Sequence, residues 1–119
     1  MTVWIGLCGI VGALMRFFLG KIIADNSKTA FPLGTFVINL TGSLILGVLY
    51  ALHQRGSISA DVWLLAGVGF CGGYTTFSTF GFETVQLVEK GMRKTALFYV
   101  LLSAVLGVCF AWIGFLLCV

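Results

Sequence analysis

Apolar residues fill four long stretches of the chain, and short polar segments separate them. The stretches run from about residue 3 to 24, 33 to 53, 62 to 89 and 95 to 117. A helix that crosses a bilayer needs about 20 mostly apolar residues, and each stretch is long enough. None shows the alternation of apolar and polar positions that marks a transmembrane β-strand. The pattern therefore predicts an all-α membrane protein with one four-helix transmembrane domain over residues 1–119.

The third stretch is unusual at its centre, although residues 62–82 carry no charge. Gly72 and Gly73 loosen the backbone there, and four hydroxyl side chains follow: Thr75, Thr76, Ser78 and Thr79. Irregular backbone at membrane depth is tolerated only where protein buries it or where it lines a wet cavity. We therefore expect a helix that is broken at the glycines and faces protein. The alternative is a plain packing face, since small and hydroxylated residues let membrane helices approach closely.

Polar residues recur at helical spacing in the first and fourth stretches. Gly9, Gly12 and Arg16 share one face, with the glycines suited to close contact. Arg16 either snorkels to the interface or places a fixed positive charge at the mouth of an anion path. In the fourth stretch, Tyr99 and Ser103 form a polar pair four residues apart, although Tyr99 also suits an interfacial anchor.

The second stretch carries a polar stripe of Thr35, Asn39 and Ser43, each four residues from the next. Thr35 follows Pro32 and Gly34, which predicts a turn with Thr35 as the N-cap of the helix. An amide in hydrocarbon is costly without a partner. Asn39 therefore either makes a hydrogen bond to another helix or donates to a permeating ion.

Two further patterns lie in the second half of the third stretch. Phe77 and Phe80 share a face, for which lipid or core contact is the ordinary role. Thr76, Thr79 and Glu83 form a polar stripe beside them, and Glu83 lies near the end of the uncharged run, which suits an interfacial carboxylate.

Composition narrows the class of protein. The 119 residues are 60% hydrophobic and 9% charged, and a soluble domain of this size could not bury so much apolar surface. The formal charge of +3 is not gathered into a patch that would bind nucleic acid. The first stretch lacks a basic leader, which favours a retained helix over a signal peptide. We expect a multi-pass protein of the inner or plasma membrane, with lipid around it.

The run Gly69–Phe80, G-F-C-G-G-Y-T-T-F-S-T-F, resembles the signature of the CrcB/Fluc fluoride channel family. Two further patterns fit the same family: Gly9-x-x-Gly12-x-x-x-Arg16 and Gly34-Thr35-x-x-x-Asn39. The resemblance implies a fluoride-selective channel for passive export, which lowers cytoplasmic fluoride that accumulates by acid trapping and so gives resistance. It also implies an antiparallel, dual-topology dimer of four-helix subunits with two pores.

The resemblance further implies roles for individual residues. Asn39, Phe77 and Phe80 would line the pore, the phenylalanines through their ring edges. Ser78 and Thr79 would belong to a track of hydroxyls. Residues 107–112 of the fourth stretch carry no hydroxyl, so Tyr99 and Ser103 are its remaining candidates.

A positive charge and a cation complete the implied site. Arg16 would lie in the vestibule. The backbone carbonyls of Gly72 and Thr75, from both subunits, would hold one central structural sodium ion. A cation at a helix break would also give the exposed carbonyls a partner.

Other functions fit the sequence less well. A proton-coupled drug exporter needs an acidic residue deep in the membrane, and Glu83 is too close to the end of its stretch. A membrane assembly protein would explain the glycines but not the hydroxyls and paired phenylalanines that follow the break. An enzyme is disfavoured because His53 is the one histidine and has no nucleophile or metal partner nearby.

The basic residues of the loops are unequally divided between the two membrane faces. The first and third loops share a face and carry Lys21, Lys28, Lys90, Arg93 and Lys94, whereas the opposite face has Arg55 alone. The positive-inside rule then favours both termini outside. Dual insertion prefers a weaker bias, so the partner is either a second copy of this chain or an oppositely oriented paralogue.

Overall fold

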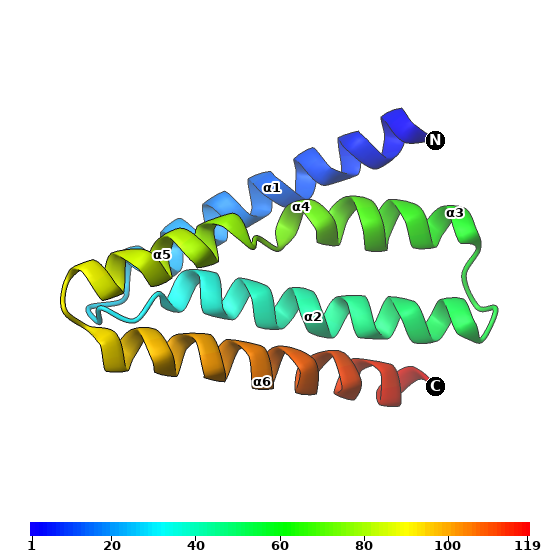
Figure 1. Cartoon of the computed structure of the whole chain (residues 1–119). Coiled ribbons are helices and arrows are strands. Elements are labelled where there is room, and N and C mark those ends of the chain that lie inside the picture. Colours follow the sequence, from blue (N-terminus) through cyan, green and yellow to red (C-terminus); the bar gives the residue numbers. More distant parts are fainter.

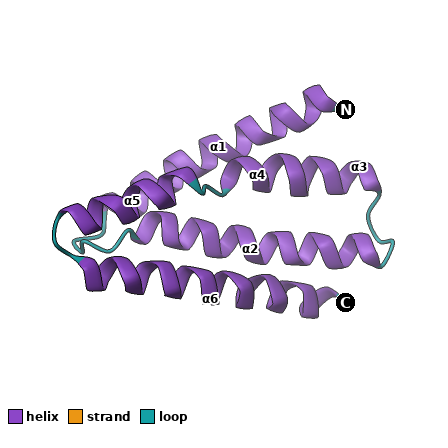
Figure 2. Ribbon diagram, in the orientation of Figure 1, coloured by secondary structure: helices purple, strands orange, loops and turns teal.

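The computed structural model describes all 119 residues and contains helices and loops but no strand (Figures 1 and 2). Three helices are long and apolar enough to cross a membrane: α1 (Thr2–Asp25), α2 (Leu33–Gln54) and α6 (Arg93–Cys118). The remaining apolar stretch is divided among α3 (Ala60–Val62), the π-helical η1 (Trp63–Cys71), α4 (Gly72–Tyr74) and α5 (Ser78–Glu89). The chain is therefore an all-helical, multi-pass membrane protein.

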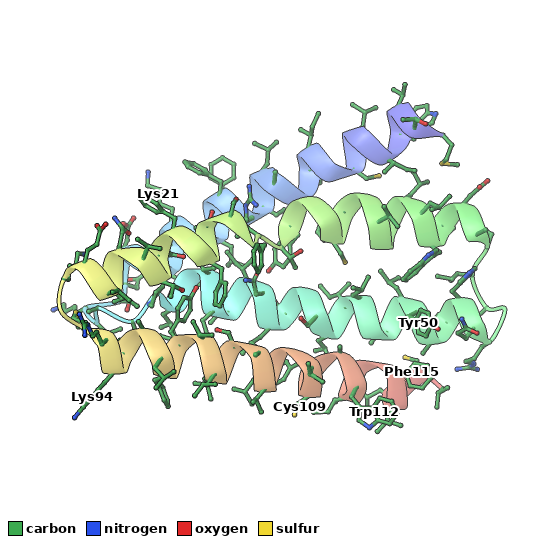
Figure 3. The ribbon with its side chains drawn as sticks, in the orientation of Figure 1. Lys21, Tyr50, Lys94, Cys109, Trp112 and Phe115 are labelled. Atoms are coloured by element: carbon green, nitrogen blue, oxygen red, sulfur yellow. The ribbon has the colours of Figure 1, made fainter.

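The helices run roughly side by side, so that the loops gather at two ends. The α1–α2 and α5–α6 loops meet at one end, and the termini lie with the α2–α3 loop at the other (Figure 1). Lys21 and Lys94 project near the first end, whereas Tyr50, Trp112 and Phe115 lie near the second (Figure 3). The charge asymmetry expected from the sequence thus corresponds to a real asymmetry between the two ends.

Glycines allow the closest approaches between helices. A Cβ on Gly12 would collide with the carbonyl of Phe70, and one on Gly73 with the carbonyl of Gly9, so α1 lies directly against η1 and α4. A Cβ on Gly114 would likewise strike the carbonyl of Leu44, where α6 meets α2. Small residues at such crossings let backbones pack closely, as the pattern in the first stretch predicts.

The backbone breaks after the paired glycines and not at them, which corrects the expectation from sequence. Gly72 and Gly73 are both helical, and the chain becomes extended at Thr75 (φ −84°, ψ 157°). Figure 2 shows the resulting short loop between α4 and α5. Gly73 is needed for its contact with α1, where a side chain would not fit. This contact does not require the backbone to leave helical geometry.

Two smaller expectations are also corrected. Pro32 and not Thr35 is the N-cap of α2, and Thr35 is buried within the first turn. Tyr99 is fully buried and so is no interfacial anchor. Thr35 is within the helix because α2 already begins at Leu33. Tyr99 is covered in part by the α1–α2 loop, whose Phe31 ring lies edge-on to it with centroids 5.2 Å apart.

The glycine contact gives a stability prediction. We expect Gly73→Ala to lower the free energy of unfolding by about 1–3 kcal/mol, because the added methyl overpacks the contact with Gly9. Thermal unfolding in detergent measures the change. Gly6→Ala on α1 is the matched control, since a Cβ there meets nothing within 4 Å. Equal unfolding temperatures for the two variants would contradict the packing account.

Candidate functional site

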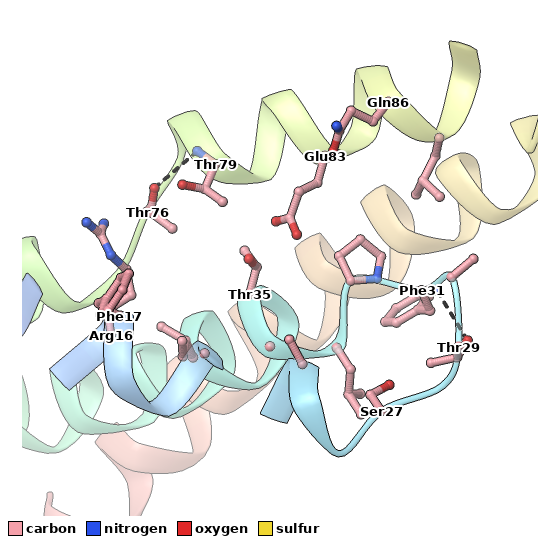
Figure 4. Close-up of a pocket in the computed structure, with 18 of the residues that line it drawn as sticks. Arg16, Phe17, Ser27, Thr29, Phe31, Thr35, Thr76, Thr79, Glu83 and Gln86 are labelled. Carbon is pink, nitrogen blue, oxygen red and sulfur yellow. Dashed lines mark hydrogen bonds between the residues drawn. The ribbon is translucent and has the colours of Figure 1, made fainter. Parts of the chain in front are cut away.

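Two side chains stabilise the interruption between α4 and α5 by accepting hydrogen bonds from its backbone N–H groups. The amide of Asn39 pairs with Thr76: Oδ1 accepts the Thr76 backbone N–H at 3.0 Å, and Nδ2 donates to the Thr76 carbonyl at 3.1 Å. The Thr76 hydroxyl then accepts the Thr79 backbone N–H at 3.2 Å (Figure 4). Asn39 therefore makes the interhelical bond that its position suggested, and its amide still has a second N–H to offer.

These bonds leave two carbonyls without their helical donors. In a continuous α-helix the Thr76 N–H would bond Gly72 and the Thr79 N–H would bond Thr75, because each donor pairs with the carbonyl four residues earlier. Both donors are engaged elsewhere. The carbonyls of Gly72 and Thr75 are the pair expected to hold sodium, and oxygen atoms freed in this way suit a hard cation.

Arg16 already approaches one of these carbonyls. Its Nη1 donates a long hydrogen bond of 3.4 Å to the Thr75 carbonyl oxygen. The side chain is partly buried and turns inward to the break, which argues against simple snorkelling. Gly72 is exposed, and a Cβ there meets nothing within 4 Å, so a second molecule has room to approach it.

A cavity of about 470 Å³ lies on one side of the break, between α1, the α1–α2 loop, the start of α2 and α5 (Figure 4). Its polar lining is rich in hydroxyls and contains both signs of charge: Arg16, Ser27, Thr29, Thr35, Thr76, Thr79, Glu83, Gln86 and Lys90. Glu83 and Thr35 point toward one another across it (Figure 4). One Glu83 carboxylate oxygen is buried without a hydrogen-bond partner. We call this space the polar cavity.

A second cavity of about 530 Å³ lies on the other side of the break, among α2, η1 and α6. Its lining contains four of the expected pore residues, Asn39, Phe77, Phe80 and Ser103, and the two expected sodium ligands, Gly72 and Thr75. We call it the aromatic cavity. Thr76 lines both cavities, so the two spaces adjoin at the segment held by Asn39.

The two phenylalanines of the aromatic cavity differ in exposure. Phe77 is 85% exposed, whereas Phe80 is half-buried, and their ring centroids are 6.1 Å apart. Phe80 also packs on Tyr99 at 4.9 Å. The hydroxyls of Tyr99 and Ser103 are both buried without a hydrogen-bond partner. Phe77, Phe80 and Tyr99 thus form a continuous aromatic row with unpaired hydroxyls beside it.

The remaining expected residues fall outside this group. Thr79 and Arg16 line the polar cavity, and Ser78, which is exposed, lies 3.5 Å from the Thr76 hydroxyl without lining either cavity. Sequence reasoning gave Thr76 and Thr35 no role in the site. The signal for Thr76 was present, because a threonine three residues before the N–H that it caps is typical of a helix start.

These features define a multi-pass helical membrane protein whose polar residues gather around an interruption in one apolar stretch. The family model of CrcB-like protein, Camphor Resistance (CrcB), matches residues 3–115. The chain belongs to this family.

Curated relatives match along nearly the whole chain. Fluoride-specific ion channel FluC 2 of Moorella thermoacetica is 45% identical over 113 residues, which cover 95% of this chain and 92% of the relative. Fluoride-specific ion channel FluC 1 of Brucella melitensis is 40% identical over 119 residues, covering 96% and 95%. Fluoride-specific ion channel FluC of Phocaeicola vulgatus is 39% identical over 108 residues, covering 91% and 89%.

Proposed function

We propose that the protein is a fluoride-selective ion channel of the plasma membrane, which lets fluoride leave the cytoplasm passively and so gives fluoride resistance. Relatives that carry the name fluoride-specific ion channel align with 91–96% of the chain and support a channel rather than an enzyme. The observation that carries the proposal is the pair of cavities that share Thr76. An ion that passes from one cavity to the other meets hydroxyls, an amide and aromatic rings.

The aromatic cavity offers what a small, strongly hydrated anion needs when it loses water. The second N–H of Asn39 and the unpaired hydroxyl of Ser103 are donors in its lining. We assign the buried, unpaired hydroxyl of Tyr99, which lies outside that lining, to the same path. The edges of Phe77 and Phe80 carry partial positive charge and add attraction without a titratable group. We assign Ser78 and Thr79, at the start of α5, to the same path as further hydroxyl donors.

Arg16 gives the polar cavity a fixed positive charge. A charge in a concave, low-dielectric site raises the local concentration of the opposite ion and the rate at which it enters. Arg16 is therefore the vestibule residue of the proposed channel. Glu83 faces Thr35 in the same cavity, and the carboxylate limits how strongly an anion is held there.

We further propose a structural sodium ion at the carbonyls of Gly72 and Thr75. When bound, the ion would add positive charge near the path and give both carbonyls a partner. Both carbonyls have lost their helical N–H donors, which supports this assignment.

The proposed assembly is a dimer in which all four apolar stretches cross the membrane and the two subunits lie antiparallel. Only 16 of the 119 residues are buried in one subunit, and Phe77 is almost fully exposed, so the aromatic cavity has room for a second subunit as a wall. The partner is a second copy of this chain or an oppositely oriented paralogue, since the basic residues favour one orientation.

Expression of this gene alone, in cells that lack other fluoride exporters, tests both the function and the assembly. We expect growth in fluoride to be restored, with cysteine labelling finding termini on both faces. Resistance that appears only with a paralogue, with termini on the outer face alone, would replace the homodimer with a pair of different chains. No resistance under either condition would contradict the proposed function.

A further inference from the structure

We propose that Arg16 is a positioning residue that competes with the central cation for the carbonyl of Thr75, so that cation binding releases the guanidinium toward the polar cavity. The inference rests on the proposed function, because it takes the Gly72 and Thr75 carbonyls as the cation site. It adds a link between that site and the vestibule, which are otherwise separate parts of the channel.

The geometry behind the link is a single shared atom. The Thr75 carbonyl oxygen has lost its helical donor because the Thr79 N–H bonds the Thr76 hydroxyl. Arg16 Nη1 lies 3.4 Å from this oxygen, which is at the long end of the range for a hydrogen bond and so is easily given up. No other hydrogen bond from the guanidinium to the protein is present, so its other N–H groups are free to bond a ligand in the polar cavity that Arg16 lines.

Binding of two positive charges to this one oxygen is unfavourable. A cation within bonding distance of the carbonyl would lie only a few ångströms from the guanidinium, and the two would repel in a partly buried site. The cation therefore weakens the contact of Arg16 with Thr75. By reciprocity, any anion that draws Arg16 into the polar cavity strengthens cation binding, so sodium and fluoride bind with positive coupling.

The test is a sodium titration of the purified protein in detergent, with N-methyl-D-glucamine chloride keeping the ionic strength constant. The unfolding temperature at each sodium concentration gives the midpoint of stabilisation. We expect Arg16→Gln to shift the midpoint to about tenfold lower sodium, because the competing charge is gone. Arg16→Met, which keeps the unbranched stem, should shift it in the same direction and serves if the glutamine variant does not fold.

Lys21→Gln is the matched control, because it removes one positive charge from an exposed position on the same helix. Its midpoint should stay within about twofold of the original, a range that allows for screened long-range effects. A midpoint that is unchanged or higher in both Arg16 variants would overturn the inference. Fluoride efflux from liposomes, measured in parallel, distinguishes failure of this inference from failure of the proposed function. If sodium stabilises no variant while fluoride still leaves the liposomes, the inference is wrong and the proposed channel function is retained.

Discussion

Replacing Phe77 or Phe80 by isoleucine is expected to lower fluoride flux at least about tenfold while the protein remains folded. Isoleucine keeps the bulk and apolarity of the side chain but removes the positive ring edge, so the ion loses an attractive contact as it sheds water. A loss of about 1.4 kcal/mol in the transition state corresponds to a tenfold change in rate. Fluoride efflux from liposomes gives the flux, and the unfolding temperature reports on the fold.

Phe82→Ile is the matched control for this experiment. Phe82 is on the same helix, is 63% exposed and lines neither the polar nor the aromatic cavity. Its replacement should leave flux within about twofold, as expected for a lone exposed apolar side chain. Near-normal flux in both Phe77→Ile and Phe80→Ile would reject the aromatic role. A drop in all three variants would show that the substitution acts through stability.

Asn39→Asp is expected to abolish flux and to lower the free energy of unfolding by about 1–3 kcal/mol, the usual cost of a buried hydrogen bond left unmade. A carboxylate can still accept the Thr76 N–H, but it cannot donate to the Thr76 carbonyl, which it faces instead as a second acceptor. The negative charge also repels fluoride where the two cavities adjoin. The variant should therefore lose both the stability of the break and the flux of fluoride.

Asn26→Asp is the matched control for Asn39→Asp, because it makes the same chemical change away from the break. Asn26 is exposed at the end of α1, where Nδ2 donates to the Ile22 carbonyl at 2.8 Å. An exposed donor is replaced by water, so stability should change by no more than about 0.5 kcal/mol and flux should persist. If Asn39→Asp conducts and unfolds as the unmodified protein does, the assignment of Asn39 to the break is wrong.

The helices could be predicted from sequence because their signal is local. Apolar runs of spanning length and short charged loops locate α1, α2 and α6, and spacing alone places Gly9 and Gly12 on the packed face of α1. The same reasoning placed the break at the paired glycines, which is wrong. Glycine flexibility permits a break but does not require one where the glycines are held in a close helix contact.

The position of the break depends on residues that are distant in sequence. Asn39 is 37 residues from Thr76, and Arg16 is 59 residues from Thr75. Helical spacing within one stretch shows that Asn39 and Arg16 are polar positions but not what they contact. The π-helical geometry of η1 is equally hidden, since no local pattern in residues 63–71 marks it. The resemblance to a known family assigned Arg16, Asn39 and Thr75 to the channel but predicted neither of these contacts.

The most direct test of the proposed function is anion efflux from liposomes that contain the purified protein and are loaded with potassium fluoride or potassium chloride. Valinomycin carries the compensating potassium, so that only the anion path limits the flux. We expect fluoride to leave the fluoride-loaded vesicles rapidly, while chloride stays at the rate of protein-free vesicles. Equal release of both anions, or no fluoride release above the protein-free rate, would contradict a fluoride-selective channel.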